Sequence, residues 1–401
     1  MKPEKINRRK FIKTAAISAI SAGFSDKLVA ADQLFDLKTQ KIPHRPLGNT
    51  GTSIPILQLG TAQGMDQEYD KIMHQCFREG VYYLDTALSY GWGRSHKAIA
   101  NFLSQIRDRR KIWITSKSSA WTTKGFVGDI NTCLKDLKTN YLDLYLKHSV
   151  SDEDDINKAL AKTGEKLKRS GKTRFFGFST HGGDIPKILQ KAVKTGGIDA
   201  ILFRYNFRSY GEKALNLAID DCYKAGIGLI AMKTYGGVSS SNKNVVKFKS
   251  QKFTLGQAKL KSVWADERIT SICSEMDSIR VARENIAAAK SEQNLSATEF
   301  HQLIQLAAKT AADACLGCSQ ICESAINHQT QIADCLRFLM YHEDYGNREK
   351  AKELYQTIPG NKRLLTPTMI NIAESSCPQG IKIGEKLQLA KSLLNPLPSV
   401  T

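Results

Sequence analysis

The chain has 401 residues, and 58 Lys and Arg against 39 Asp and Glu give it a formal net charge of +19. This length allows about two domains. The positive charge favours anionic partners in general, but the basic residues are spread along amphipathic segments, so we expect a solvated cationic surface and no nucleic-acid site. No apolar run approaches the roughly 20 residues that cross a bilayer, which argues against an integral membrane segment.

The first 31 residues predict a twin-arginine export signal. The run N-R-R-K-F-I-K at Asn7–Lys13 precedes an uncharged stretch from Thr14 to Ser25, and Val29–Ala31 offers small residues for cleavage. Seven basic and two acidic residues give this segment +5, which leaves +14 for the mature chain. Because this export route carries folded proteins, we expect a periplasmic protein that is assembled before export. An ordinary basic N-terminal helix is the alternative.

From residue 56 onward, short apolar runs alternate with amphipathic stretches. Eight runs are predicted to be strands: Ile56–Gly60, Val81–Asp85, Ile112–Ser116, Tyr141–His148, Arg174–Ser179, Ala200–Arg204, Ile227–Lys233 and Ile269–Met276. Helical patterns lie between them at Asp66–Gly80, Phe126–Leu137, Asp154–Ser170, Ile185–Thr195 and Glu212–Ala225. Eight repeats of this alternation predict an α/β fold, a closed (β/α)8 TIM barrel over residues 42–292, more than an open doubly wound sheet.

Polar residues follow three neighbouring strands of the predicted barrel. Asp85 ends the second strand with Tyr90 just beyond it, Lys117 follows the third strand, and His148 ends the fourth. Each residue alone has a structural explanation, such as a helix cap or a buried histidine. Because catalytic residues of such barrels lie at the carboxyl ends of the strands, the four together predict an active site.

Four motifs resemble those of the aldo-keto reductase family. They are R-P-L-G-N-T-G-T-S-I-P at Arg45–Pro55, D-T-A-L-S-Y-G-W-G-R-S at Asp85–Ser95, L-D-L-Y-L-K-H at Leu142–His148 and G-K-T-R-F-F-G-F-S at Gly171–Ser179. The resemblance covers roughly Ile42 to Lys290. It implies an oxidoreductase that transfers hydride between a nicotinamide cofactor and a small carbonyl or alcohol substrate.

The resemblance also implies a role for each of the four rim residues. Tyr90 would be the general acid, and Lys117, at about 4 Å, would favour its phenolate and so lower its pKa. Asp85 would hold Lys117 charged. His148 would hydrogen-bond the substrate oxygen and orient it.

The cofactor implied by the resemblance is NADP or NAD. Ser179 matches the serine that meets the nicotinamide carboxamide, and Arg280, Arg283 and Asn285 lie near the place of the phosphate-binding residues. The cofactor positions that depart from the family pattern are Thr180, Leu202, Met232, Glu275, Met276 and Val281, and His96 stands where the family has Glu. Since an acidic residue repels a 2′-phosphate, the choice between the two nucleotides stays open. Arg280 and Arg283 could also simply form a solvated helix face.

After Lys290 the pattern becomes helical, and residues 293–401 are predicted to form a small α-helical, ferredoxin-like domain. Helices are expected at Ser296–Ala312, Thr330–Tyr341 and Glu349–Gln356, with a packing stripe at Ile332, Leu336 and Leu339. The cysteines resemble one complete ligand set of a two-cluster ferredoxin: Cys315, Cys318, Cys322 and Cys377, the last followed by Pro378. The other set is replaced by Ile326, Pro367, Ile370 and Ala373.

The four cysteines predict one [4Fe–4S] cluster as the metal site. The first run is C-x2-C-x3-C, whereas the bacterial ferredoxin spacing is C-x2-C-x2-C, so zinc, disulfides and unliganded thiols stay open as alternatives. Leu336–Ala351 and Cys377–Ile383 resemble the tail of the iron–sulfur branch of the reductase family, whose members often carry twin-arginine signals.

The sequence therefore predicts an exported aldo-keto reductase-type enzyme with a helical iron–sulfur domain and a redox partner protein. Two alternatives stay open. One is an exported iron–sulfur electron-transfer or binding protein whose barrel is not catalytic, which the departures from the cofactor pattern favour. The other is a barrel whose helical tail is purely structural.

Overall fold

The computed structural model of the chain describes residues 41–395 except 63, 121 and 238–247. Residues 42–401 form one compact unit, and the description below concerns that unit. The predicted export signal, residues 1–31, lies outside the described residues. No helix of the described part is long and apolar enough to cross a membrane.

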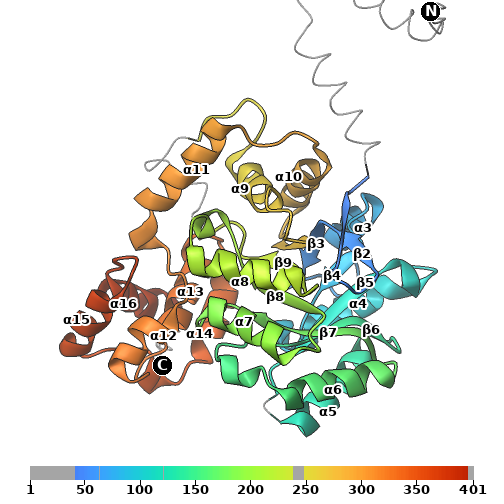
Figure 1. Cartoon of the computed structure of the whole chain (residues 1–401), viewed down its shortest axis with the longest axis horizontal. Coiled ribbons are helices and arrows are strands. Elements are labelled where there is room, and N and C mark those ends of the chain that lie inside the picture. The colour runs from blue at the N-terminus through green and yellow to red at the C-terminus, as the bar shows by residue number, and fades with distance from the viewer. Residues whose placement is uncertain (1–40, 63, 121, 238–247, 396–401) are drawn as a thin grey trace, which may run out of the picture. The chain divides into compact units, whose positions relative to one another are not determined.

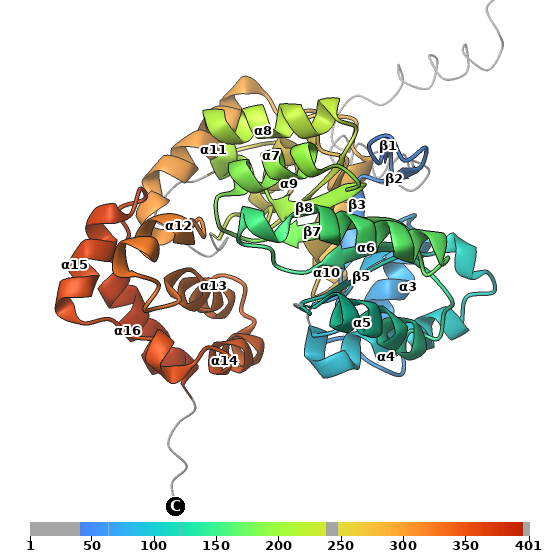
Figure 2. The same ribbon diagram turned by 60° about the horizontal axis from the view of Figure 1, so that its bottom comes forward.

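Eight parallel strands close into a barrel in the order β10-β3-β4-β5-β6-β7-β8-β9. Their bounds are β3 Leu57–Gly60, β4 Tyr83–Asp85, β5 Trp113–Ser118, β6 Leu142–Lys147, β7 Thr173–Thr180, β8 Ala200–Arg204, β9 Gly228–Met232 and β10 Ser271–Glu275. The eight predicted strands and the barrel are confirmed. Figures 1 and 2 show helices placed around these strands.

The helices of the barrel follow the strands in chain order. They are α3 Lys71–Arg78, α4 Arg94–Ser104, α5 Thr123–Asp136, α6 Lys158–Arg169, α7 Ile185–Thr195, α8 Lys213–Lys224, α9 Leu255–Trp264 and α10 Ile279–Lys290. The first predicted helix begins later than expected from Asp66. The Asp66 carboxylate accepts hydrogen bonds from the backbone N–H groups of Glu68 and Tyr69 in a turn, and Asp70 caps the helix instead.

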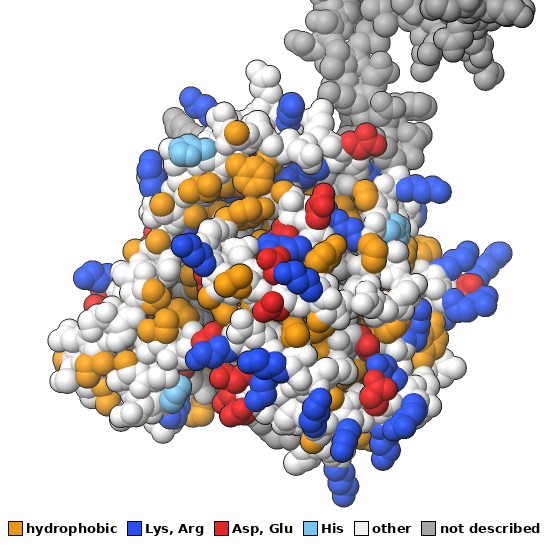
Figure 3. Space-filling model, in the orientation of Figure 1, with side chains coloured by type: hydrophobic (Ala, Val, Ile, Leu, Met, Phe, Trp, Pro, Cys, Tyr) orange, Lys and Arg blue, Asp and Glu red, His pale blue; other side chains and the backbone are white. Residues whose placement is uncertain are grey.

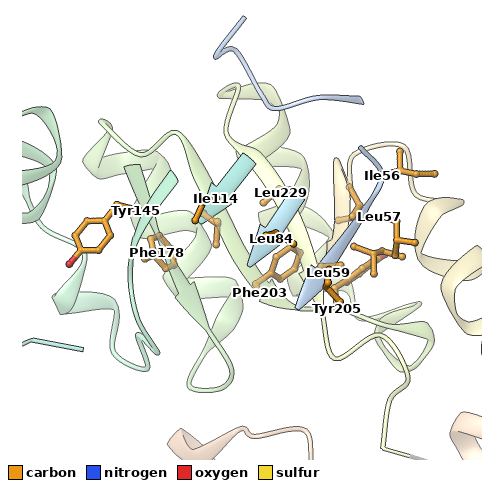
Figure 4. Packing of buried hydrophobic residues seen from close by; sticks show 14 of the residues in the cluster. Ile56, Leu57, Leu59, Leu84, Ile114, Tyr145, Phe178, Phe203, Tyr205 and Leu229 are labelled. Carbon is orange, nitrogen blue, oxygen red and sulfur yellow. The ribbon is translucent and has the colours of Figure 1, made fainter. Parts of the chain in front are cut away.

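Alternate residues of each strand face two separate apolar layers. In β6, Tyr145 points outward, packs against Phe126 and donates a hydrogen bond to its backbone oxygen at 3.0 Å. Its neighbours Leu144 and Leu146 belong to a smaller cluster with Leu202 and Ile230. Figure 4 shows outer-layer side chains contributed by successive strands. This alternation is the packing expected of a closed parallel barrel.

The motif at Arg45–Pro55 forms a β-hairpin that the sequence did not predict, with strands β1 His44–Pro46 and β2 Ser53–Pro55. Its turn approaches the start of β9 closely. Gly48 has a φ of +51°, and a Cβ atom there would lie 2.1 Å from the Gly226 carbonyl oxygen. Glycine is therefore required at this position for both its conformation and its size.

The C-terminal region is helical, as predicted. Its helices are α11 Ala297–Lys309, α12 Ser319–Cys322, α13 Ile332–Glu343, α14 Arg348–Gln356, α15 Pro367–Ser376 and α16 Ile383–Leu394. Ile332, Leu336 and Leu339 are buried in a core of their own, so the expected packing stripe is confirmed. The two-domain division and the likeness to a ferredoxin stay predictions.

The surface shown in Figure 3 carries many Lys and Arg side chains. They are scattered over that face among Asp and Glu and do not gather into one block. This distribution agrees with a solvated cationic surface.

Candidate active site

Three neighbouring strands bring the four predicted catalytic residues to one rim of the barrel. Asp85 is the last residue of β4, Lys117 lies near the end of β5, and His148 directly follows β6. The Lys117 ammonium donates hydrogen bonds to Asp85 Oδ1 at 2.6 Å, to the Thr86 carbonyl oxygen at 2.8 Å and to the Tyr90 hydroxyl at 3.2 Å. The rings of Tyr90 and His148 meet edge to face, with centroids 5.9 Å apart.

A tight turn after β4 positions Tyr90. Gly91 and Trp92 both have a φ of +55°, in the left-handed region, which is costly for a bulky residue such as tryptophan. The Trp92 indole N–H donates to the carboxylate of Glu353 on α14. The strained turn is thus held by a contact with the C-terminal helices.

The charge environment of Tyr90 differs from the expectation. Burial, followed by the carboxylate of Asp85, raises the pKa of Tyr90 well above its ordinary value. The expected lowering of this pKa by Lys117 is wrong for the structure, because burial of the phenol outweighs it and the Asp85 carboxylate adds to the increase. The phenol therefore keeps its proton at neutral pH.

Asp85 and His148 are also perturbed by burial. Burial raises the pKa of Asp85, and the charge of Lys117 counteracts this effect. Burial, with the nearby charges of Lys117 and Arg337, lowers the pKa of His148 to about 3. His148 is therefore a neutral imidazole at physiological pH, with one nitrogen able to donate a hydrogen bond.

A cavity of about 330 Å³ begins at Asp85, Tyr90, Lys117 and His148 and extends to the start of α10. Of the predicted cofactor residues, Ser179 and Arg280 line it. Ser179 is buried and accepts a hydrogen bond from the backbone N–H of Ser149 at 3.0 Å. Arg280 lies at the far end and pairs with Glu284 at 3.4 Å.

The other two cofactor candidates are placed elsewhere. Arg283 is exposed and is not part of the cavity lining. Asn285 is fully buried, donates to Ser274 Oγ at 3.0 Å and accepts from the Tyr235 hydroxyl at 2.7 Å. Its side chain thus fixes α10 against β10 and does not line the cavity.

The residues that depart from the family pattern mostly line the same cavity. Leu202, Met232 and Glu275 all do so, whereas the Thr180 hydroxyl donates to the Gly182 carbonyl oxygen at 2.9 Å. The cavity thus has Ser179 near the four rim residues and the Arg280–Glu284 pair at its far end.

The four C-terminal cysteines lie near one another. Burial raises the pKa of the Cys315 thiol to about 12, and the neighbouring Cys318 and Cys377 thiols add to this increase. Cys315 Sγ accepts a hydrogen bond from the Gly317 N–H at 3.4 Å. All nine cysteines are free, so the disulfide alternative is not supported.

No group of three or more His, Cys, Asp or Glu residues in the described ranges is arranged to hold a metal ion. The arrangement therefore does not support the predicted cluster, which stays a prediction. A second cavity, of about 540 Å³, lies beside Cys315 and is also lined by Arg204, Arg337 and His181.

The C-terminal helices add residues to the barrel rim that the sequence did not indicate. Lys233, next to β9, donates to the hydroxyl of Tyr341 on α13 at 2.5 Å. Asp344, Tyr345 and Asn347 line the same cavity as Tyr90. No spacing rule connects residues so far apart in the sequence, so only the fold could reveal them.

Comparisons with known proteins agree with this geometry. L-galactose dehydrogenase of Arabidopsis thaliana is 26% identical over 289 residues, which cover 64% of this chain and 90% of that protein. The uncharacterized oxidoreductase YqkF of Bacillus subtilis is 24% identical over 298 residues, which cover 64% of this chain and 95% of that protein.

Solved structures show the same fold. The holo form of aldo-keto reductase AKR11C1 from Bacillus halodurans matches with a TM-score of 0.55 at 20% identity, covering 67% of this chain and 96% of that one. The thermostable aldo-keto reductase Tm1743, in complex with the inhibitor epalrestat, matches with a TM-score of 0.55 at 26% identity, covering 66% and 99%.

The model of the Aldo/keto reductase family matches residues 57–343, which is well over half of the chain. The match includes all eight barrel strands and the rim that carries Asp85, Tyr90, Lys117 and His148. This chain belongs to the aldo/keto reductase family and is an oxidoreductase of that type.

Proposed function

We propose that the protein transfers hydride between a nicotinamide dinucleotide and a small carbonyl or alcohol substrate, with Tyr90 as the proton donor to the carbonyl oxygen. This proposal rests on one observation: the ammonium of Lys117 donates hydrogen bonds both to Asp85 and to the Tyr90 hydroxyl. The bound dinucleotide would supply the hydride.

Tyr90 serves as the acid because its phenol stays protonated until the substrate arrives. Once the proton is given up, the Lys117 ammonium at 3.2 Å stabilises the phenolate. Asp85 and the Thr86 carbonyl oxygen fix the position of that ammonium. The neutral imidazole of His148 donates a hydrogen bond to the substrate oxygen and sets its orientation.

Ser179 and Arg280 would hold the two ends of the dinucleotide. Arg280 already pairs with Glu284, and a 2′-phosphate bound there would have to compete with that carboxylate. Titration with NADH and NADPH, followed by quenching of protein fluorescence, shows which nucleotide binds more tightly.

The test of the proposal is the variant Tyr90→Phe, which removes one oxygen. We expect carbonyl reduction to fall by about 10³-fold, while the dinucleotide Kd changes little. Tyr223→Phe, which alters an exposed tyrosine of α8, is the matched control. A Tyr90→Phe enzyme with normal reduction rates would refute the role of Tyr90.

We also propose that Cys315, Cys318, Cys322 and Cys377 ligate one [4Fe–4S] cluster. The proposal is supported by the closeness of the thiols and by the backbone N–H that Gly317 directs at Cys315 Sγ. Such a cluster places iron and sulfide between its thiolates, which therefore stand farther apart than around a single ion. About four irons and four sulfides per anaerobically purified chain are expected, and absence of both would refute the cluster.

A second candidate function is that of an iron–sulfur electron-transfer or binding protein whose barrel does not turn over. The apolar side chains of Leu202 and Met232 in the cavity, at two positions that depart from the cofactor pattern, favour it. Iron without dinucleotide binding would support this candidate over the reductase.

Export through the twin-arginine route is the last part of the proposal, and it is supported by the motif at Asn7–Lys13. Replacement of Arg8 and Arg9 by lysine should retain the protein in the cytosol. A native chain found only in the cytosol would refute export.

A further inference from the structure

The second cavity, of about 540 Å³, lies between the rim of the barrel and the C-terminal region. Its lining includes His181 directly after β7, Arg204 at the end of β8, and Arg337 on α13. Of the four C-terminal cysteines, only Cys315 lines it, so this cavity is not the space between the four thiols. Its volume is ordinary for the binding site of a small organic molecule.

Arg204 uses little of its hydrogen-bonding capacity within the protein. Its Nε donates to the carbonyl oxygen of His181 at 3.3 Å, and this is its one hydrogen bond to the described residues. Arg208 lines the same cavity, but its guanidinium donates to three protein oxygens at 2.5–3.0 Å. Since a guanidinium carries five N–H groups, Arg204 has donors left for a ligand, whereas Arg208 serves the fold.

Five carboxylates also line the cavity, but within the described part of the chain none of them forms an ion pair with Arg204. Asp334 is paired with Arg337 at 2.8 Å. Glu323 accepts a hydrogen bond from the backbone N–H of Ala333 at 2.8 Å. The other three are Asp313, Glu343 and Asp344. The positive charge of Arg204 is therefore not neutralised by a protein carboxylate in contact with it.

Arg337 is a second guanidinium with an unused donor. Its Nε is buried and has no acceptor among the residues that the structure describes. The lining thus holds two guanidiniums with more N–H groups than protein acceptors. A cation would be repelled here, and a neutral ligand would leave the charge of Arg204 uncompensated. A carboxylate or phosphate would compensate that charge and accept two parallel hydrogen bonds from one guanidinium.

We propose that the second cavity binds a small organic anion, whose carboxylate or phosphate group pairs with the guanidinium of Arg204. The proposal is independent of the reductase function, because Arg204 does not line the cavity that holds Tyr90. It gives the C-terminal region a binding role, since the loop at Cys315 and α13 supply much of the wall.

The experiment titrates the full-length protein with succinate and with inorganic phosphate at low ionic strength, followed by calorimetry. We expect saturable binding of at least one probe, with one site per chain. The tighter of the two identifies the group that the site prefers. The variant Arg204→Met should weaken that binding at least about tenfold, and Arg204→Lys, which keeps the charge, should weaken it less.

Two control variants remove one positive charge elsewhere. Arg110→Met alters an exposed arginine that pairs with Asp108, and Arg280→Met alters an arginine of the catalytic cavity. Both should leave the Kd of the anion near the wild-type value. Binding that weakens in Arg280→Met but not in Arg204→Met would overturn the proposal, because the anion would then occupy the catalytic cavity. A wild-type protein that binds neither probe would also overturn it.

A second measurement uses only the wild-type protein and so does not depend on the folding of a variant. Phenylglyoxal modifies accessible arginines, and peptide mass spectrometry follows each of them separately. The bound probe should slow the modification of Arg204 and leave that of Arg110 unchanged. Equal rates at Arg204 with and without a saturating probe would contradict the assignment of this arginine to the site.

Discussion

The ammonium of Lys117 lies 3.2 Å from the hydroxyl oxygen of Tyr90 and 2.6 Å from Asp85, and its side chain is almost completely buried. The variant Lys117→Met should reduce kcat/KM by about 10²-fold or more, because the phenolate formed on proton transfer loses its counter-charge. Dinucleotide binding should change little. Steady-state kinetics and a fluorescence titration check the two expectations.

This variant also leaves the buried Asp85 carboxylate without its cation, which costs about 3–5 kcal/mol of stability. The double variant with Asp85→Asn removes both charges, so it should regain stability without regaining activity. Lys135→Met, at an exposed position of α5, is the control. Normal catalysis by the folded double variant would contradict the role given to Lys117.

The pH profile of carbonyl reduction should be flat through the neutral range. The pKa of Tyr90 is raised, so the acid keeps its proton well into alkaline solution. The pKa of His148 is lowered to about 3, so the imidazole stays neutral on the acid side. Measurement of kcat/KM between about pH 6 and pH 9 checks this expectation. If kcat/KM rises or falls with pH in this range, and this change disappears in Tyr90→Phe or His148→Gln, then the pKa given to that residue is wrong.

Stability should fall as the solution becomes acidic, partly because of His96. The pKa of His96 differs between the folded and the unfolded protein. Burial lowers it to about 4 in the folded protein, whereas an unfolded histidine titrates near ~6.5. The unfolded chain therefore binds the proton first, and stability is lost as pH falls from about 6.5 to about 4.

The variant His96→Gln should lose less stability over that range, by on the order of 3 kcal/mol. Denaturant unfolding at neutral and at acidic pH measures the difference. His301→Gln, which removes an exposed histidine of α11, should follow the wild-type curve. If His96→Gln showed the same acid loss as the wild-type protein, the buried neutral state of His96 would be wrong.

Gly177→Ala should prevent the barrel from closing properly. Gly177 lies in β7 opposite Ala200 of β8, and a Cβ atom there would stand 1.8 Å from the Ala200 carbonyl oxygen. Since neither backbone can move without breaking the strand pairing, we expect loss of soluble, folded protein. Gly128 lies on the exposed face of α5, and a Cβ atom there would have no other atom within 4 Å. The variant Gly128→Ala should therefore be more stable than the wild-type protein by about 0.5–1 kcal/mol. Circular dichroism and thermal unfolding distinguish the two outcomes.

The barrel was predictable because each strand is a compact apolar run bounded by polar residues. The predicted strands match the observed ones to within two residues at each end. The meeting of Asp85, Lys117 and His148 at one rim was predictable for the same reason, since parallel strands place the residues at their carboxyl ends side by side. The β1–β2 hairpin was missed because its strands have only three residues each, too few for an alternating pattern to stand out.

The contribution of the C-terminal region to the site could not be read from the sequence. Lys350 lies in a charged helical stretch that looks like a solvated face, and only the tertiary structure brings its ammonium beside the Tyr90 ring. The predicted cofactor residues on α10 are only partly brought together by the fold. The family resemblance suggested phosphate binding there, yet Arg283 is exposed and does not line the cavity, and Asn285 serves the packing of α10.

The backbone of the loop after β7 meets the backbone of the loop that carries Cys315 and Cys318. The N–H of Gly183 donates to the carbonyl oxygen of Gly317 at 3.1 Å, and a Cβ atom on Gly182 would lie 2.4 Å from that same oxygen. Because two backbones meet here with no room for a Cβ atom, any larger residue at position 182 would push the loop after β7 and the loop that carries Cys315 and Cys318 apart.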